Sequence, residues 1–205
     1  MKNKRILIYT LLPLFILSSC TATSNFLSSS SPDDNGFFLS ADEYKNAKTI
    51  AESKHYKIIQ SDSLYYYYIY DENHDIVKSD GSFNREPHIQ MINHILKFTL
   101  QAGTGIGTQW GFFYDTNSEA FSQIFQCIFD QCNEKVIYGD INNIVVQDIF
   151  DYNKYYREIT AFKEPFSDMF DPIINAKFTN NGTCIEVTYF TGSNYKEVIE
   201  VFDLT

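Results

Sequence analysis

The sequence lacks the short motifs by which many enzymes and metalloproteins are recognised. It has no G-x-S-x-G nucleophile elbow, no C-x-x-C pair, and only four histidines, no two of them four residues apart. The glycine-rich stretch 102–115, AGTGIGTQWGFFYD, has neither the G-x-G-x-x-G spacing nor the lysine of a P-loop. Strand-forming residues follow it, where phosphate binding needs the start of a helix. We therefore expect a corner between two strands here, and no metal or other cofactor.

The sequence also has no apolar run of the about 18–20 residues that a transmembrane helix needs. Its N-terminal apolar core, residues 6–17, has 12 residues, contains Pro13 and follows Lys2, Lys4 and Arg5. A basic start, a short apolar core and small residues before a cleavage position are typical of a secretory signal. These features predict an exported protein with a signal peptide at residues 1–19.

The cleavage region, Leu17-Ser18-Ser19-Cys20, resembles the lipobox of bacterial lipoproteins. The resemblance implies that a diacylglyceryl group is attached to the Cys20 thiol and that the mature chain begins there. Two acyl chains, such as palmitate, at roughly 0.8 kcal/mol for each buried CH₂, make such an anchor stable. The expected location is thus the extracytoplasmic face of the cell membrane. The alternative is an ordinary signal peptide with a chance cysteine.

The rest of the chain divides into a linker and one domain. Residues 20–36 are rich in Ser, Asp, Asn and Thr and read as a flexible tether, while residues 37–205 suffice for a single domain with its own core. Without residues 1–19 the chain keeps 13 basic and 26 acidic residues, a net charge of −13. Nucleic acid would be repelled by such a surface, so we expect no nucleic-acid partner.

Cysteine is scarce in the predicted domain, which has Cys127, Cys132 and Cys184. An exported protein can form disulfides, but three is an odd number, so either one bridge forms or all three remain thiols. Zinc is disfavoured because no histidine lies near any of the three in sequence.

The predicted secondary structure is one helix followed by strands. Residues 40–43, SADE, have the form of a capping box, and Tyr44, Ala47, Ile50 and Ala51 recur at helical spacing, so we predict an amphipathic helix over residues 41–54. Residues 64–70, LYYYYIY, predict a strand, and we expect it to lie at a sheet edge where a partner could add a strand. Leu96, Phe98 and Leu100 alternate with polar residues, and Asn181-Gly182 predicts a two-residue hairpin.

Further strands are expected in residues 109–115, 121–130, 135–140, 143–150, 172–179, 183–190 and 195–202, and residues 151–171 could hold a short strand or a helical turn. Short strands separated by turn residues predict a mainly β domain of antiparallel meanders, arranged either as a sandwich or as stacked sheets like propeller blades. No repeat of fixed period is evident.

Two acidic turns and the histidines were considered as metal sites. Residues 71–75, DENHD, alternate oxygen ligands as a calcium loop does, but glycine is missing at its sixth position and glutamate at its twelfth, so a solvated turn is favoured. Residues 115–119, DTNSE, have the same explanation. His88 and His94 would share a face of a regular strand, which does not by itself make a site.

The aromatic content, 15 Tyr and 18 Phe with a single Trp, is the most suggestive feature for function. Tyr65 to Tyr68 must alternate between the two faces of a strand. Tyr65, Tyr67 and Trp110 are the candidate ligand-binding residues, because exposed aromatic rings stack on sugars and peptides. The favoured alternative is that these rings fill a core that has few leucines.

Residues 108–125, 143–159 and 187–204 are similar to segments of small, uncharacterised lipoproteins of Gram-positive bacteria. The resemblance implies a location and no activity. We therefore predict a lipid-anchored, non-enzymatic domain that binds a protein, peptide or cell-envelope component. Two alternatives stay open: a hydrolase of envelope glycans or peptides built on dispersed carboxylates, and an assembly factor of a membrane complex.

Overall fold

The computed structural model of the chain describes residues 39–104, 108–139, 143–168 and 172–205. All of them belong to one compact unit, Asn35–Thr205. The predicted signal peptide, Cys20 and the tether lie outside the described residues, as do Gly105 and Gly107. Within the described part of the chain, no helix has the length and apolar character required to cross a membrane.

The described residues form four antiparallel sheets, each built from consecutive strands, which confirms the predicted mainly β meanders. The first sheet comprises β1 Lys48–Glu52, β2 Tyr56–Ser61, β3 Leu64–Tyr70 and β4 Ile76–Phe83. The second comprises β5 His88–Ile92, β6 Ile95–Gln101, β7 Gln109–Asp115, β8 Ala120–Phe121 and β9 Phe125–Gln126. The third comprises β10 Asp130–Cys132, β11 Lys135–Gly139, β12 Ile144–Asp148 and β13 Tyr156–Ile159. The fourth comprises β14 Ile173–Thr179, β15 Cys184–Thr191 and β16 Lys196–Asp203.

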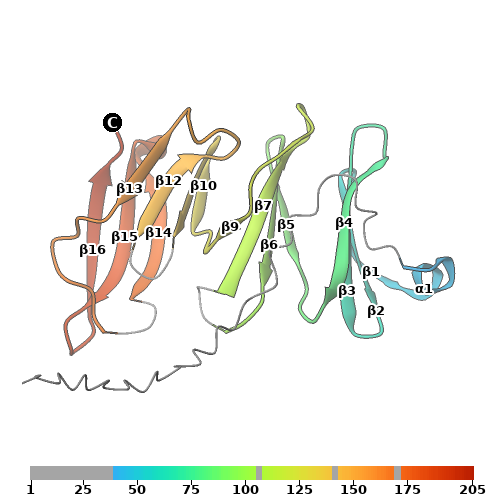
Figure 1. Cartoon of the computed structure of the whole chain (residues 1–205), viewed down its shortest axis with the longest axis horizontal. Coiled ribbons are helices and arrows are strands. Elements are labelled where there is room, and N and C mark those ends of the chain that lie inside the picture. Colours follow the sequence, from blue (N-terminus) through green and yellow to red (C-terminus); the bar gives the residue numbers. More distant parts are fainter. Residues whose placement is uncertain (1–38, 105–107, 140–142, 169–171) are drawn as a thin grey trace, which may run out of the picture. The chain divides into compact units, whose positions relative to one another are not determined.

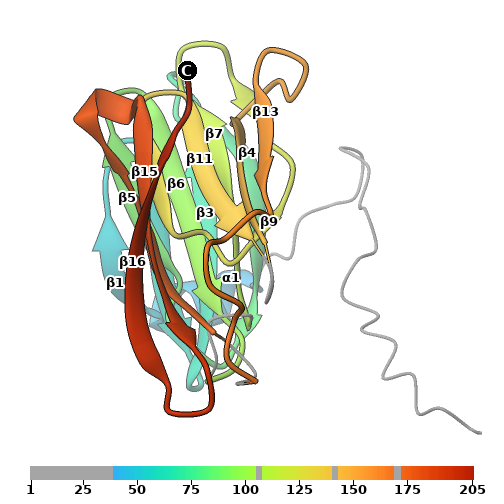
Figure 2. The same cartoon turned by 90° about the vertical axis from the view of Figure 1, so that its left-hand side faces the viewer.

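The four sheets stack in sequence order, because a hydrophobic cluster lies between each consecutive pair (Figures 1 and 2). Tyr67 and Ile69 of the first sheet pack with Phe98 of the second. Phe113 of the second packs with Val136 of the third. The third and fourth sheets share a larger cluster of aliphatic side chains with the buried Tyr189. Each sheet therefore contributes one layer, like a propeller blade.

The predicted helix is present but shorter than expected. Helix α1 spans Ala41–Asn46, and its capping box forms: Ser40 N donates to Glu43 Oε2 at 2.9 Å, and Glu43 N donates to Ser40 Oγ at 3.3 Å. Residues 48–52 form β1 instead, because they pair with β2 and so satisfy their backbone groups across the sheet. Local helical periodicity is thus overridden by tertiary pairing. Tyr44 of α1 makes an edge contact with Tyr68, with ring centroids 5.8 Å apart, on the outer face of the first sheet.

The glycine-rich stretch is a connection between strands, as predicted. It links β6 to β7, which pair over their whole length from Ile95↔Asp115 to Gln101↔Gln109. Trp110 packs against the cluster between the first two sheets, with its ring centroid 5.5 Å from that of Phe98. Among the described residues, strand β7 follows these glycines at residue 109, whereas phosphate binding by a glycine-rich loop needs the N-terminus of an α-helix there.

Four short turns reveal an internal repeat that inspection of the sequence missed. In each, an aromatic residue precedes an aspartate whose Oδ1 accepts the backbone N–H two residues later, at 2.8–2.9 Å. This is an Asx turn. The four copies are YDEN at 70–73, YDTN at 114–117, FDYN at 150–153 and FDLT at 202–205, one for each sheet. Irregular spacing hides the repeat, and the first two copies are the predicted solvated turns.

Other details correct the sequence-based expectations. Strand β3 is not an edge strand, because β2 and β4 flank it. The hairpin at Asn181-Gly182 is longer than the predicted two-residue turn: Thr179 pairs with Cys184, so residues 180–183 form the loop, which contains the 3-10 turn Asn180–Gly182. Residues 121–130 are mostly irregular and contribute only short strands, whereas the segment 151–171 does contain a strand, β13.

Candidate functional site

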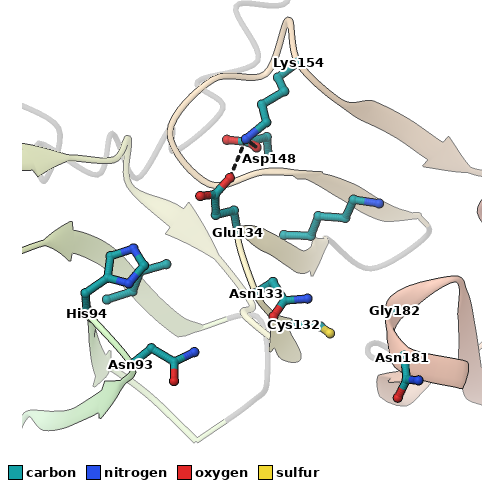
Figure 3. Close-up of a pocket in the computed structure, with 11 residues that line it drawn as sticks. Asn93, His94, Cys132, Asn133, Glu134, Asp148, Lys154, Asn181 and Gly182 are labelled. Carbon is teal, nitrogen blue, oxygen red and sulfur yellow. Dashed lines mark hydrogen bonds and ion pairs between the residues drawn. The ribbon is translucent and has the colours of Figure 1, made fainter. Parts of the chain in front are cut away.

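A polar pocket of about 370 Å³ lies where hairpin turns of three consecutive sheets meet (Figure 3). The second sheet contributes the turn between β5 and β6, the third the turn between β10 and β11, and the fourth the turn between β14 and β15. The β12–β13 connection closes the pocket with Asp148 and Lys154. Amide, carboxylate and ammonium groups in its lining can form hydrogen bonds with a small polar group.

An asparagine in the left-handed conformation occupies each of the three hairpin turns. The φ angles are 56° at Asn93, 51° at Asn133 and 54° at Asn181. Asparagine tolerates the left-handed conformation better than most L-residues, which explains why it occurs in each of these turns. A consequence is that the pocket gains three amide groups, each of which can donate and accept hydrogen bonds.

The charged groups of one wall form a network around Lys154. Its Nζ lies 3.1 Å from Asp148 Oδ2 and also pairs with Glu134. Hydrogen bonds to Glu134 and Asp148 raise the pKa of Lys154 above its usual value. The Asp148 side chain is buried, and its other oxygen accepts backbone N–H groups of Phe150 and Asp151, each at 3.0 Å. This network fixes the β12–β13 turn at the rim of the pocket.

The opposite wall carries a histidine and a thiol. His94 Nε2 lies 3.8 Å from Asp115 Oδ2. Partial burial opposes ionisation of Asp115, but hydrogen bonds from Asn117 and Ser118 outweigh it and lower the pKa of Asp115. Cys132 lies under the Asn180–Gly182 turn: a Cβ placed on Gly182 would be 3.0 Å from Cys132 Sγ. The fold thus brings a histidine into the same pocket as a cysteine, which sequence distance did not indicate.

The three cysteines of the domain have different surroundings. Cys127 is buried, whereas Cys132 and Cys184 are half-buried, and none of the three forms a disulfide with another described residue. Among the residues that the structure describes, no three His, Cys, Asp or Glu side chains are grouped so as to hold a metal ion.

The predicted ligand-binding aromatics lie away from the pocket. Tyr65, Tyr67 and Trp110 all belong to the cluster between the first two sheets, and Tyr67 is only 1% exposed. The alternation of Tyr65 to Tyr68 is confirmed, since Tyr66 and Tyr68 pack on the opposite face. A ligand role for Tyr65 and Trp110, which are half-buried, stays a prediction; Tyr67 presents no surface on which a ligand could stack.

Exposed aromatic rings occur instead beside Lys154. Tyr152 is 62% exposed and lies in the same turn as Lys154, and Tyr156, the first residue of β13, is 53% exposed. The sequence signal was the run DYNKYY at 151–156, which combines three tyrosines with the turn-forming residues Asp151 and Asn153. Amphipathic rings in this position are typical of recognition surfaces.

Comparison with known proteins gives no family. No protein-family description and no curated protein matches the chain. Among solved structures, Hsv2p of Kluyveromyces lactis, a propeller protein, is similar at a TM-score of 0.40 and 13% identity, over 78% of this chain and 49% of that one. A structure of the mitotic checkpoint complex is similar at a TM-score of 0.37 and 10% identity, over 99% of this chain and 59% of that one. The chain thus spans about half the length of these structures, and similarity at this level assigns no function.

Proposed function

We propose that this chain is a lipid-anchored, extracytoplasmic interaction domain whose hairpin-end pocket binds a protein, peptide or cell-envelope component. The observation that carries the proposal is the convergence of turns from three consecutive sheets on one polar pocket. The three turn asparagines supply hydrogen bonds, and exposed tyrosines beside Lys154 supply apolar contact area. A pocket of this composition suits recognition of a polar group presented by a larger partner.

The arrangement of charges favours binding over hydrolysis. Glu134 and Asp148 are the carboxylates that the pocket brings together, and the Lys154 ammonium contacts both (Figure 3). Glycoside hydrolysis needs two carboxylates that flank the scissile bond of the substrate. Here the Lys154 ammonium group pairs with both carboxylates, which supports a role for the pair in holding the β12–β13 turn.

The anchor is proposed from the N-terminal sequence. The basic start, short apolar core and Leu-Ser-Ser-Cys segment support lipidation of Cys20. In cells grown with labelled palmitate, the full-length protein should incorporate label and sediment with membranes after a high-salt wash. Cys20→Ser should abolish labelling and release the protein. Labelling that survives Cys20→Ser would contradict the proposed anchor site.

A thermal-shift screen tests the pocket. The panel contains peptidoglycan fragments, sugars, cationic peptides, nucleotides and metal ions. A ligand present at 100 times its Kd stabilises the folded state by about 2.7 kcal/mol. For a domain of this size that corresponds to a rise in Tm of roughly 5–10 °C.

Glycine substitutions localise any such ligand. Asn93→Gly and Asn133→Gly remove the pocket amides while keeping a residue that accepts positive φ. Asp62→Gly is the matched control, because Asp62 has φ 48° in the β2–β3 turn and does not line the pocket. The pocket variants should lose the ligand-induced rise and the control should keep it. A rise unchanged in both pocket variants would refute the pocket as the binding site.

A further inference from the structure

Strand β16 is an unusual sheet edge in the described part of the chain. It runs regularly for eight residues, and its pairing with β15 continues without a bulge from Cys184↔Asp203 to Thr191↔Lys196. The other edge strands that exceed five residues, β4 and β14, each contain a register shift. The remaining edges have at most five residues. Short or bulged edges discourage strand pairing, so β16 lacks a common protection.

The second side of β16 is open within the described residues. The fourth sheet has the order β14-β15-β16, and no described strand pairs with the outer side of β16. Alternate backbone N–H and C=O groups of an edge strand point away from its neighbour. Such a strand can accept an extended segment that completes the hydrogen-bond ladder.

The side chains of β16 divide cleanly between two faces. Val198 and Phe202 pack on the cluster between the third and fourth sheets, and Glu200 is buried on the same face. On the outer face, which Figure 2 shows turned toward the viewer, Ile199 and Val201 are 58% and 57% exposed. These are the most exposed aliphatic side chains of the described residues. Their burial would be favourable.

Acidic side chains flank this apolar pair. Glu197 and Asp203 are exposed at the two ends of the outer face of β16. On the neighbouring strand, Glu186 opposes Val201, although it already pairs with Lys177 at 2.7 Å. A strand that matches this face needs apolar residues at its centre and cations at its ends.

A second copy of β16 does not match it. In an antiparallel pair of β16 strands, the two exposed faces lie on the same side only if odd-numbered residues oppose odd-numbered residues. The register that places Ile199 opposite Val201 of the other copy also places Glu197 opposite Asp203, and buried Glu200 opposite itself. Like charges directly opposed across strands are destabilising. Charge complementarity therefore points to a different, cationic chain.

We propose that β16 binds an extended, cationic segment of a partner protein as an added strand. The segment would carry the pattern cation-x-apolar-x-apolar-x-cation, with the cations near Glu197 and Asp203 and the apolar residues over Ile199 and Val201. This proposal rests on the proposed function of protein recognition and names a surface and a partner chemistry for it. The pocket and β16 are separate parts of the structure and can be tested separately.

Synthetic peptides test the pattern on the full-length protein in detergent. The probe has the sequence Lys-Thr-Val-Thr-Val-Thr-Lys, and its control replaces both lysines by glutamate. The cationic peptide should bind at least tenfold more tightly, should weaken as salt is added, and should slow amide exchange in β16. Equal affinity for the two peptides, or slowed exchange elsewhere but not in β16, would overturn the proposal.

Variants locate the contact. The double variant Ile199→Lys, Val201→Lys changes two exposed side chains and should reduce affinity for the cationic peptide at least tenfold. Ile76→Lys with Val77→Lys is the matched control, since these residues are 44% and 38% exposed on β4. Glu197→Lys should weaken the cationic peptide and strengthen the acidic one. Loss of affinity in the β4 control to the same extent would overturn the assignment to β16.

Photo-crosslinking in membranes separates the two proposals. A photoreactive residue is placed at position 199 in one variant and at position 133 in another. Partner adducts at position 133 alone would refute strand addition at β16 and leave the pocket proposal standing. The expected result is a partner adduct at position 199 that disappears when the cationic peptide is added in excess. No adduct at either position would contradict both the pocket proposal and the strand-addition proposal.

Discussion

Gly111→Ala should destabilise the protein strongly, because the middle of β7 has no room for a side chain. Gly111 pairs with Thr99 on β6 and with Phe125 on β9. An added Cβ would lie 2.1 Å from the carbonyl oxygen of Phe98 and 2.9 Å from Ile128 Cδ1. The first of these is a backbone atom of a paired strand, so relief requires the two strands to separate.

The size of the effect follows from two contributions. Overpacking in a well-packed region costs about 1–3 kcal/mol, and each ladder hydrogen bond that is lost adds about 1 kcal/mol. We expect a loss of about 2–4 kcal/mol in the free energy of unfolding. At about 2–4 °C for each kcal/mol in a domain of this size, Tm should fall by roughly 4–16 °C.

Gly103→Ala is the matched control in the same glycine-rich stretch. Its Cβ would lie 2.7 Å from Cγ2, 2.9 Å from Oγ1 and 3.0 Å from Cβ of Thr108, an exposed residue of the connection that can shift without separating two paired strands. We expect a cost below about 1 kcal/mol. Urea unfolding followed by the fluorescence of Trp110, the single tryptophan, measures both variants, and circular dichroism checks that the same transition is seen. Equal losses in the two variants, or a stable Gly111→Ala, would refute the close approach of β6 and β7.

Three further predictions concern stability. Burial raises the pKa of Tyr70 to about 12, against about 10 in an unfolded chain. The contribution of Tyr70 to stability is therefore intact below about pH 10 and lost between about pH 10 and 12. Over that pH range the urea concentration at the unfolding midpoint should fall less in Tyr70→Phe than in the unchanged protein. Glu200→Ala removes the carboxylate that accepts the hydrogen bond of the buried Tyr189 hydroxyl at 3.1 Å. It should lower the free energy of unfolding by about 2–4 kcal/mol, and Glu200→Gln, which keeps an acceptor, should lower it less. Equal losses in the two variants would contradict a stabilising role for this hydrogen bond. Ser40→Ala should weaken α1 by about 1 kcal/mol, visible as faster amide exchange in α1 with little change in Tm.

Much of the secondary structure was predictable because the signals are local. The alternation of Leu96, Phe98 and Leu100 fixed which side of β6 faces a core, and this is the side found in the cluster between the first two sheets. The absence of a helix after the glycines could be read from the strand-forming residues 109–115, which form β7. Turn-forming residues predicted most of the connections between strands, because the backbone preferences of these residues depend on few neighbours.

The ends of elements were less predictable where distant pairing competes with local preference. Residues 48–52 have helical periodicity, yet they form β1 because β2 offers them backbone partners and places Ile50 and Ala51 against the core. Strand β3 was expected at a sheet edge, where a partner could add a strand. It is a central strand in which Tyr67 is buried, since rings of this size can fill a core with few leucines.

The candidate site could not be predicted, because its residues come from separate hairpins. His94 and Cys132 lie far apart in the chain, so nothing in the sequence places them together. Asn93, Asn133 and Lys154 carry no motif that marks them as site residues. The sign that could have indicated the layered arrangement is the repeated aromatic-aspartate turn, which irregular spacing conceals.

The sequence by itself determined the alternation that makes strands, the capping of α1, the turn chemistry and the acidic balance, all of which depend on residues close together in the chain. Tertiary structure alone decided which faces meet, which turns share a pocket, and which edge stays open. Those outcomes depend on the stacking of sheets through buried side chains far apart in sequence. An exposed pair such as Ile199 and Val201 has the same local pattern as a buried one, and only the absence of a described layer over the fourth sheet distinguishes it.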